Sequence, residues 1–257
     1  MRVLFLFILI ILCASCVSVN NNPNQNGSVR FVDGQERVQM MKPDKSDTTE
    51  AVFSYKYYQN CDSVFKDSAN AQIYQFTIGF TESTRSDSIG VLSPQFFNSQ
   101  LNYFYQMYLS EDGNYHLWEM EGRAKVIDER RDFVQLDLGG WTYTGGAHGN
   151  GFSKTVIIDR NSGRVLRLTD FIKDTQELNK IAESEFRILY DLNSEESINE
   201  AGFWFENDQF QLNENFSFTE SHMCFFYNSY EIAPYSGGPT LLEVPIEKIR
   251  HLLNEKF

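Results

Sequence analysis

The stretch WTYTGGAHGNG, at residues 141–151, interrupts a region with strand-like sequence on both sides. It holds four glycines and one histidine, and it holds no acidic residue. Glycine tolerates positive φ and lets another backbone approach closely, so this pattern predicts a specialised turn or bulge. His148 lies in its middle and can face either solvent or the core. Taken alone, the stretch indicates a shaped loop with one titratable group, and it names no reaction.

Four consecutive strands are predicted around this loop, at residues 115–127, 133–144, 152–159 and 165–168. Their short separations favour antiparallel hairpins. In the second strand Val134, Leu136 and Leu138 alternate with Gln135 and Asp137. This alternation predicts one buried face and one wet face.

The remaining chain contains both strand and helix patterns. Strands are expected at residues 52–58, 71–80, 216–218, 223–227 and 230–233, and helices at residues 94–109, 175–192 and 246–257. Ser93-Pro94 is a favourable start for the first helix. Thr175 is the expected cap of the second helix. Its predicted core stripe consists of Leu178, Ile181, Ala182, Ile188, Leu189 and Leu192.

The N-terminus is typical of an exported lipoprotein. Residues 1–15 combine one cation, Arg2, with an apolar run too short to span a bilayer. LCASC at residues 12–16 resembles a bacterial lipobox with Cys16 as the acylated residue, although Cys13 departs from its usual pattern. The alternative is simple secretion, with Cys16 inside the signal. No early acidic run follows Cys16, which favours the periplasmic face of the outer membrane in the bacterial cell envelope.

Residues 16–50 are rich in Asn, Gln, Ser, Asp and Lys. So few apolar side chains bury too little surface to offset the entropy lost on ordering. We therefore expect a disordered tether between a lipid anchor in the membrane and the folded chain.

The charge balance narrows the range of partners. The formal net charge is -13, and removal of residues 1–15 takes away Arg2 and leaves -14. So acidic a chain argues against binding to nucleic acid and to anionic lipid headgroups. It favours a basic partner electrostatically, whereas the simpler interpretation is that acidity maintains solubility.

Two cysteines lie beyond the acylation site, Cys61 and Cys224. Disulfides persist in exported proteins, so the two are a possible pair, and each can equally be a small buried apolar residue. Beyond Cys16 the chain has no CxxC, no HExxH and no paired-histidine spacing. Because these motifs are absent, we expect neither a metal site nor a cofactor.

Several separated motifs carry a family resemblance: GGAHG at 145–149, TVIID at 155–159, SGRVLRLTDF at 162–171, YEIAPYSGG at 230–238, VPI at 244–246 and LL at 252–253. Together they resemble the RsiV-like C-terminal domain, a bacterial envelope domain of unknown function that often follows a PdaC-like N-terminal module. The resemblance covers residues 115–257 well. Residues 51–114 match the N-terminal module only in the order of strands and helices.

The resemblance implies an α+β fold with curved antiparallel sheets and helices packed on one face. In one relative, an anti-sigma regulator, such a domain binds lysozyme, and in another the module precedes a peptidoglycan deacetylase domain. This chain has neither a cytoplasmic sigma-binding segment before a membrane helix nor a following deacetylase domain. The resemblance therefore implies a domain that recognises an envelope glycan or a protein acting on one.

Three functions follow from these observations. The first is a non-enzymatic lipoprotein that binds a cell-wall glycan or an envelope protein. Its expected ligand-binding residues are Tyr143, Gly145, Gly146, His148, Gly149, Asn150, Tyr235, Gly237 and Gly238. The second is a sensor or inhibitor of a basic protein such as lysozyme. The third is a cell-wall hydrolase with His148 as general base and Asp159 or Glu231 orienting it. We expect no catalytic residue under the first two.

Overall fold

The computed structural model describes residues 30–42, 45–59, 63–82, 90–111 and 116–254. The expected signal segment at 1–15, the acylation site Cys16, Cys61 and the start of the expected tether lie outside these ranges. Within them, no helix is both long enough and apolar enough to cross a bilayer.

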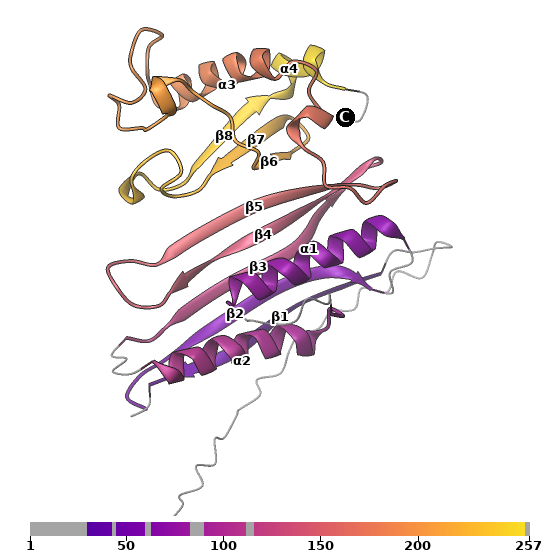
Figure 1. Cartoon of the computed structure of the whole chain (residues 1–257), viewed down its shortest axis with the longest axis vertical. Helices are drawn as coiled ribbons and strands as arrows, with labels where there is room; N and C mark the ends of the chain where they lie inside the picture. Colours follow the sequence, from indigo (N-terminus) through magenta and orange to yellow (C-terminus); the bar gives the residue numbers. More distant parts are fainter. Residues whose placement is uncertain (1–29, 43–44, 60–62, 83–89, 112–115, 255–257) are drawn as a thin grey trace, which may run out of the picture.

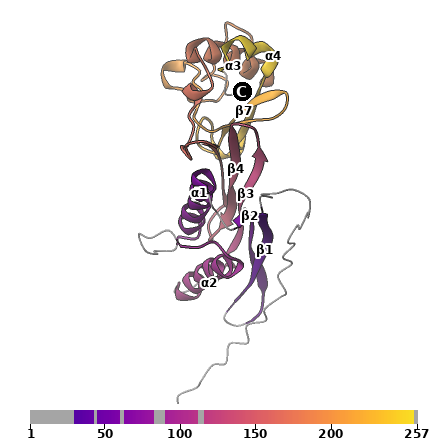
Figure 2. The same ribbon diagram turned by 90° about the vertical axis from the view of Figure 1, so that its right-hand side faces the viewer.

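The larger sheet has five strands in sequence order: β1 (Arg30–Met41), β2 (Thr48–Gln59), β3 (Glu119–Glu129), β4 (Phe133–Tyr143) and β5 (Asn150–Asp159). The β2–β3 pairing is parallel and the others are antiparallel. Between β2 and β3 the chain forms α1 (Val64–Phe80) and α2 (Pro94–Ser110), which cover one face of the sheet (Figure 2). The smaller sheet holds β6 (Phe216–Phe218), β7 (His222–Tyr227) and β8 (Thr240–Pro245).

The smaller sheet lies beyond the β5 edge of the larger one (Figure 1). Helices α3 (Thr175–Leu189) and α4 (Ile246–Ile249) pack against it, and the short 3-10 turn Arg250–Leu252 follows α4. The structure confirms the predicted α+β class with open, mostly antiparallel sheets. Of the helix expected over 246–257, the described residues show only the short helix α4 and the 3-10 turn that follows it.

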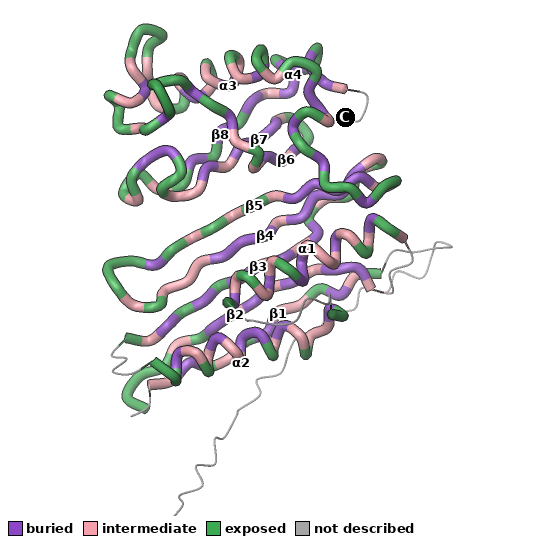
Figure 3. The backbone as a smooth tube through the Cα atoms, viewed as in Figure 1, coloured by how far each residue is buried: buried purple, intermediate pink, exposed green. Residues whose placement is uncertain are grey.

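Two hydrophobic clusters hold the chain together, and both are visible as buried segments in Figure 3. The first lies between the larger sheet and its two helices, where Phe97 of α2 stacks on Tyr55 of β2 with ring centroids 4.1 Å apart. The second joins α3 and the smaller sheet to Phe133 of β4 and Ile157 of β5. The sheet thus runs through the expected boundary at 114/115, because β2 pairs directly with β3.

The tether expected over residues 16–50 is wrong from Arg30 onwards, because β1 and the start of β2 lie there. The inward positions of β1 include Gly34 and Glu36, which hid the alternation in the sequence. Gly34 leaves room for the Tyr55 ring, since a Cβ there would lie 2.8 Å from the tyrosine oxygen. Glu36 is buried and accepts a hydrogen bond from the Tyr55 hydroxyl at 2.9 Å.

The strand expected over residues 71–80 is also wrong, because this segment is the second half of α1. Its aromatic and β-branched residues favour a strand locally. Over the whole helix, however, Phe65, Ala69, Ile73 and Thr77 are buried at intervals of four residues. That spacing puts all four side chains on one helix face against the sheet, and this packing overrides local propensity.

Helix α2 confirms its expected start, since the Ser93 hydroxyl accepts a hydrogen bond from the Phe96 amide at 3.1 Å and Pro94 follows it. Helix α3 corrects two details. Its cap is Asp174 rather than Thr175, and its buried stripe ends at Phe186. Ile188 and Leu189, expected in the core, are 70% and 50% exposed.

Four further expectations differ from the structure. Gln135 was expected on a wet face, but it is buried, and its amide bonds both the N–H and the C=O of Phe218 at 2.8 and 2.9 Å. Residues 165–168 form only an isolated bridge at Val165. Residues 230–233 form a turn, whereas β8 was not predicted. β8 is only six residues long, so its alternation gave little signal, whereas β7 lies where a strand was expected at 223–227.

Candidate functional site

Two loops at the same end of the molecule make up the candidate site, the β4–β5 connection and the β7–β8 connection (Figure 1). Gly145 and Gly146 both have φ of +98°, a backbone conformation that residues with a side chain rarely adopt. These two glycines therefore turn the chain after β4. Gly149 lies under the Trp141 ring, where a Cβ would come within 2.1 Å of it. Tyr143 donates its hydroxyl to the Gly146 carbonyl at 3.1 Å. The glycines therefore place His148 at the tip of the connection.

The second loop meets the first at His148. The imidazole stacks on the Tyr235 ring, with centroids 3.6 Å apart and planes 14° apart. The Tyr230 hydroxyl lies 3.2 Å from Nε2, and Nδ1 lies 2.9 Å from the Gly149 carbonyl oxygen. Since a carbonyl only accepts, Nδ1 carries a proton, and in the neutral imidazole Nε2 is then the acceptor for the Tyr230 hydroxyl. We call His148, Tyr230 and Tyr235 the aromatic corner.

The aromatic corner is accessible. His148 is exposed, Tyr230 is 53% exposed, and Tyr235 is half-buried beneath the imidazole. Tyr230 also has φ of +68°, an uncommon conformation for an aromatic residue. Such strain is retained only where surrounding contacts hold it, and it clusters at functional sites.

Trp204 extends the aromatic surface. It is 47% exposed, and its indole N–H donates to the Glu231 carbonyl at 3.1 Å. The Glu231 carboxylate accepts hydrogen bonds from the Asn213 side-chain amide at 2.7 Å and from the backbone N–H of Asn228 at 2.8 Å. These bonds fix the second loop from within, next to Tyr230.

The structure brings the two expected loops together, and the expected residues have different roles within them. Tyr143, Gly145, Gly146, Gly149 and Asn150 shape the first loop and the start of β5. Gly237 ends the 3-10 turn that begins at Tyr235, and Gly238 follows with φ of +71°. Sequence reasoning missed Tyr230 and Trp204 as site residues. Trp204 stands in the aromatic run Phe203–Phe205, which was the available signal.

No carboxylate of the described part of the chain bonds to His148. Asp159 lies at the far end of β5, about 30 Å away for nine residues of strand. It is buried and accepts hydrogen bonds from the turn at Asn161 and Ser162. The Glu231 carboxylate accepts hydrogen bonds from Asn213 and Asn228 and not from His148. Among the described residues, then, neither carboxylate that the hydrolase hypothesis requires orients the imidazole.

Cys224 is a free thiol, buried in β7, and burial raises its pKa to about 11. Cys61, its possible disulfide partner, lies outside the described residues, so the pairing stays a prediction. The described ranges also contain no cluster of three or more histidine, cysteine or acidic side chains able to hold a metal ion.

Comparison with known proteins identifies part of the chain. Residues 169–247 match the family described as "Protein of unknown function (DUF3298)". The chain contains a DUF3298 domain. This domain spans α3 and β6 to β8 and supplies Tyr230 and Tyr235, whereas His148 comes from the larger sheet that precedes it. The aromatic corner is thus one of several places where the DUF3298 domain contacts the larger sheet.

Two solved structures share the fold. One is a DUF3298 family member from Bacteroides fragilis, 19% identical, with a TM-score of 0.71 over 91% of this chain and 96% of that one. The other is a DUF3298 family protein from Pseudomonas aeruginosa, 16% identical, with a TM-score of 0.59 over 89% and 96%. No curated protein matches the sequence. The similarity thus extends beyond the DUF3298 domain to the larger sheet, and it concerns the fold alone.

Proposed function

We propose that this chain is a non-enzymatic binding lipoprotein of the bacterial cell envelope, and that it holds a cell-wall glycan at the aromatic corner. The observation that carries the proposal is the exposed stack of His148 on Tyr235. Two loops distant in sequence converge to form it, and each is turned by glycines. The ring pair faces solvent and belongs to neither of the two hydrophobic clusters.

The chemistry of the corner suits a sugar. Aromatic rings offer an apolar face for stacking, and the tyrosine hydroxyl offers a hydrogen bond at the ring edge. Tyr230 presents both, and Trp204 adds a second exposed face nearby. Because the two loops are anchored by their own hydrogen bonds, little conformational entropy is lost when a ligand binds.

The envelope location rests on the N-terminal sequence and on the family resemblance. The lipobox-like LCASC at 12–16 supports a lipid anchor on Cys16, with the periplasmic face of the outer membrane as the site of attachment. The resemblance to the RsiV-like C-terminal domain and the PdaC-like module supports a role beside the cell wall. Radiolabelled fatty acid incorporated into the wild type and not into Cys16→Ser would test the anchor.

Binding to purified peptidoglycan and to chitooligosaccharides tests the glycan proposal. We expect wild-type chain to bind, and Tyr235→Ala and His148→Ala each to weaken binding about tenfold, equivalent to about 1.4 kcal/mol. Ile188→Ala is the control, since it removes an exposed apolar side chain from α3. Equal binding by all four proteins, with unchanged melting temperatures, would remove the corner from the function.

The second candidate is a basic envelope protein such as lysozyme, which the formal net charge of -13 favours. Opposite charge speeds the encounter of two proteins, and salt screens it. Lysozyme binding that weakens steeply between low and physiological salt would support this candidate. Glycan binding that is insensitive to salt, without lysozyme binding, would support the first.

A further inference from the structure

Strand β5 forms an edge of the larger sheet, and side chains rather than another strand cover its outer side near the site. The Ser153 amide donates to Asn228 Oδ1 at 2.7 Å, and the Thr155 amide donates to Asn215 Oδ1 at 2.9 Å. Asn215 Nδ2 in turn donates to the Ser153 carbonyl at 2.8 Å. The two asparagines thus occupy the edge as a neighbouring strand would.

Further along β5, the chain that returns after the β5 turn covers the edge. The Leu166 amide donates to the Ile157 carbonyl at 2.7 Å, and the Asp159 amide donates to the Arg164 carbonyl at 2.9 Å. The returning chain then leaves β5 at Leu166. The edge is therefore paired at both ends and interrupted between them.

At the interruption, two backbone groups of β5 are not covered by another segment of the described chain: the Thr155 carbonyl and the Ile157 amide. In a strand, the N–H and the C=O of one residue point to the same side of that strand. The Thr155 carbonyl therefore faces outward like the Thr155 amide, and the Ile157 amide faces outward like the Ile157 carbonyl. Among the described residues, neither group has a hydrogen-bond partner. An acceptor and a donor on one strand edge are what an extended peptide pairs with.

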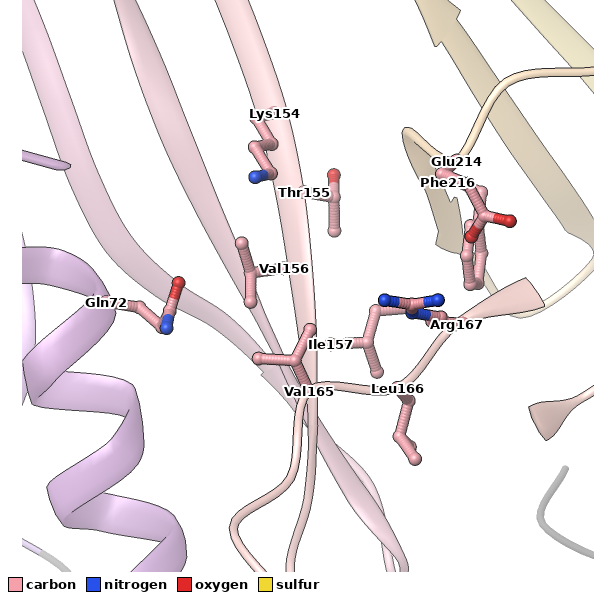
Figure 4. A pocket seen from close by; sticks show the side chains of 10 residues that line it. All are labelled: Gln72, Lys154, Thr155, Val156, Ile157, Val165, Leu166, Arg167, Glu214 and Phe216. Atoms are coloured by element: carbon pink, nitrogen blue, oxygen red, sulfur yellow. The ribbon is translucent and has the colours of Figure 1, made fainter. Parts of the chain in front are cut away.

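Thr155 and Ile157 both line a cleft of about 310 Å³ (Figure 4). Its volume falls at the lower end of those of small-molecule sites. Apolar side chains form part of its wall, and the lining consists of Gln72, Lys154, Thr155, Val156, Ile157, Val165, Leu166, Arg167, Glu214 and Phe216.

Charged groups stand around the cleft. Lys154 and Arg167 are exposed, and neither forms an ion pair with a described residue. Glu214 also lines the cleft, and its carboxylate accepts a hydrogen bond from the backbone amide of Leu168, the residue after Arg167, at 3.2 Å. Two cations without ion-pair partners beside one carboxylate make this cleft locally positive on a chain of net charge -13.

We propose that this cleft binds the C-terminal end of a short peptide. The peptide lies along β5, gives an N–H to the Thr155 carbonyl and accepts the Ile157 amide, and its terminal carboxylate reaches Arg167. Arginine pairs with carboxylate through two parallel hydrogen bonds, which fixes the direction of the peptide. Recognition through backbone and carboxylate makes the site tolerant of the side chains it takes.

Calorimetric titration of the full chain in detergent micelles with acetyl-Ala-Ala tests the proposal. We expect binding that weakens at least tenfold in Arg167→Gln, and equally for wild type titrated with acetyl-Ala-Ala-amide, which lacks the carboxylate. Arg131→Gln is the matched control, because it removes an exposed arginine outside the cleft. It should bind as wild type does.

Amide hydrogen exchange locates the ligand independently of any substitution. With acetyl-Ala-Ala bound, we expect slower exchange at Ile157 and no change at Asp159, which is already bonded. The proposal is overturned if wild type does not bind acetyl-Ala-Ala, if acetate alone binds as tightly, or if Arg167→Gln binds unchanged. Protection that appears elsewhere and not at Ile157 also overturns it. None of these results depends on the aromatic corner.

Discussion

The His148 imidazole lies flat against the Tyr235 ring, with centroids 3.6 Å apart, although one residue follows β4 and the other precedes β8. The contact joins the larger sheet to the DUF3298 domain at the surface. It therefore has a structural role as well as the proposed binding role, and the two can be measured separately.

The stacking energy is measured by a double-mutant cycle over His148→Ala and Tyr235→Ala. We expect the two substitutions to couple by about 0.5–1.5 kcal/mol in the free energy of unfolding, as aromatic pairs do. Urea unfolding of the four proteins gives the value. A coupling energy of zero would mean that the rings are adjacent without stabilising each other.

Gly149→Ala should destabilise the protein, because its Cβ would lie 2.1 Å from the Trp141 ring. Overpacking of this kind costs about 1–3 kcal/mol. Gly79→Ala is the matched control, since Gly79 stands in α1 with nothing within 4 Å of an added Cβ. There the change should stabilise by up to about 1 kcal/mol through helix propensity. Thermal melts of both variants decide whether their signs differ.

Glu36→Gln should raise stability at pH 7. Burial raises the pKa of Glu36, while the hydrogen bond from Tyr55 opposes the shift. A carboxyl whose folded pKa lies above its unfolded value contributes stability that is full below the unfolded pKa and falls as pH rises through the folded pKa. Glutamine keeps the acceptor for Tyr55 and does not ionise.

The melting temperature of Glu36→Gln relative to wild type should therefore increase from pH 4 to pH 7. Glu50→Gln removes the same charge from an exposed position on β2 and controls for the change in net charge. If the Glu36→Gln difference were constant over this range, burial of Glu36 would have no energetic consequence.

Cys224 should resist alkylation in the folded protein. Burial and the nearby Glu243 carboxylate raise its pKa to about 11, so at pH 8 roughly one thiol in a thousand is the reactive thiolate. Iodoacetamide labelling located by peptide mass spectrometry should leave Cys224 unmodified without denaturant and label it in urea. Fast labelling of the native chain would contradict its buried place in β7.

Much of the fold could be predicted from local patterns. The hairpin of β4 and β5 was predicted to within two residues, because alternation continues through both strands. The entry of Ser93-Pro94 into α2 was predicted from capping chemistry alone. β1 was missed because two of its inward positions are Gly34 and Glu36, whose suitability depends on Tyr55 of the neighbouring strand.

Local sequence and composition were sufficient to predict the turn at Gly145-Gly146, the helix start at Ser93 and the acidic character of the chain, because these depend on side chains within a few residues or on residue counts. Three features could be found only in the folded molecule: His148 stacks on Tyr235, Asn215 and Asn228 cover β5, and Gln135 is buried. Each of these requires partners at least sixty residues away, whose position is set by packing of the two hydrophobic clusters rather than by local propensity.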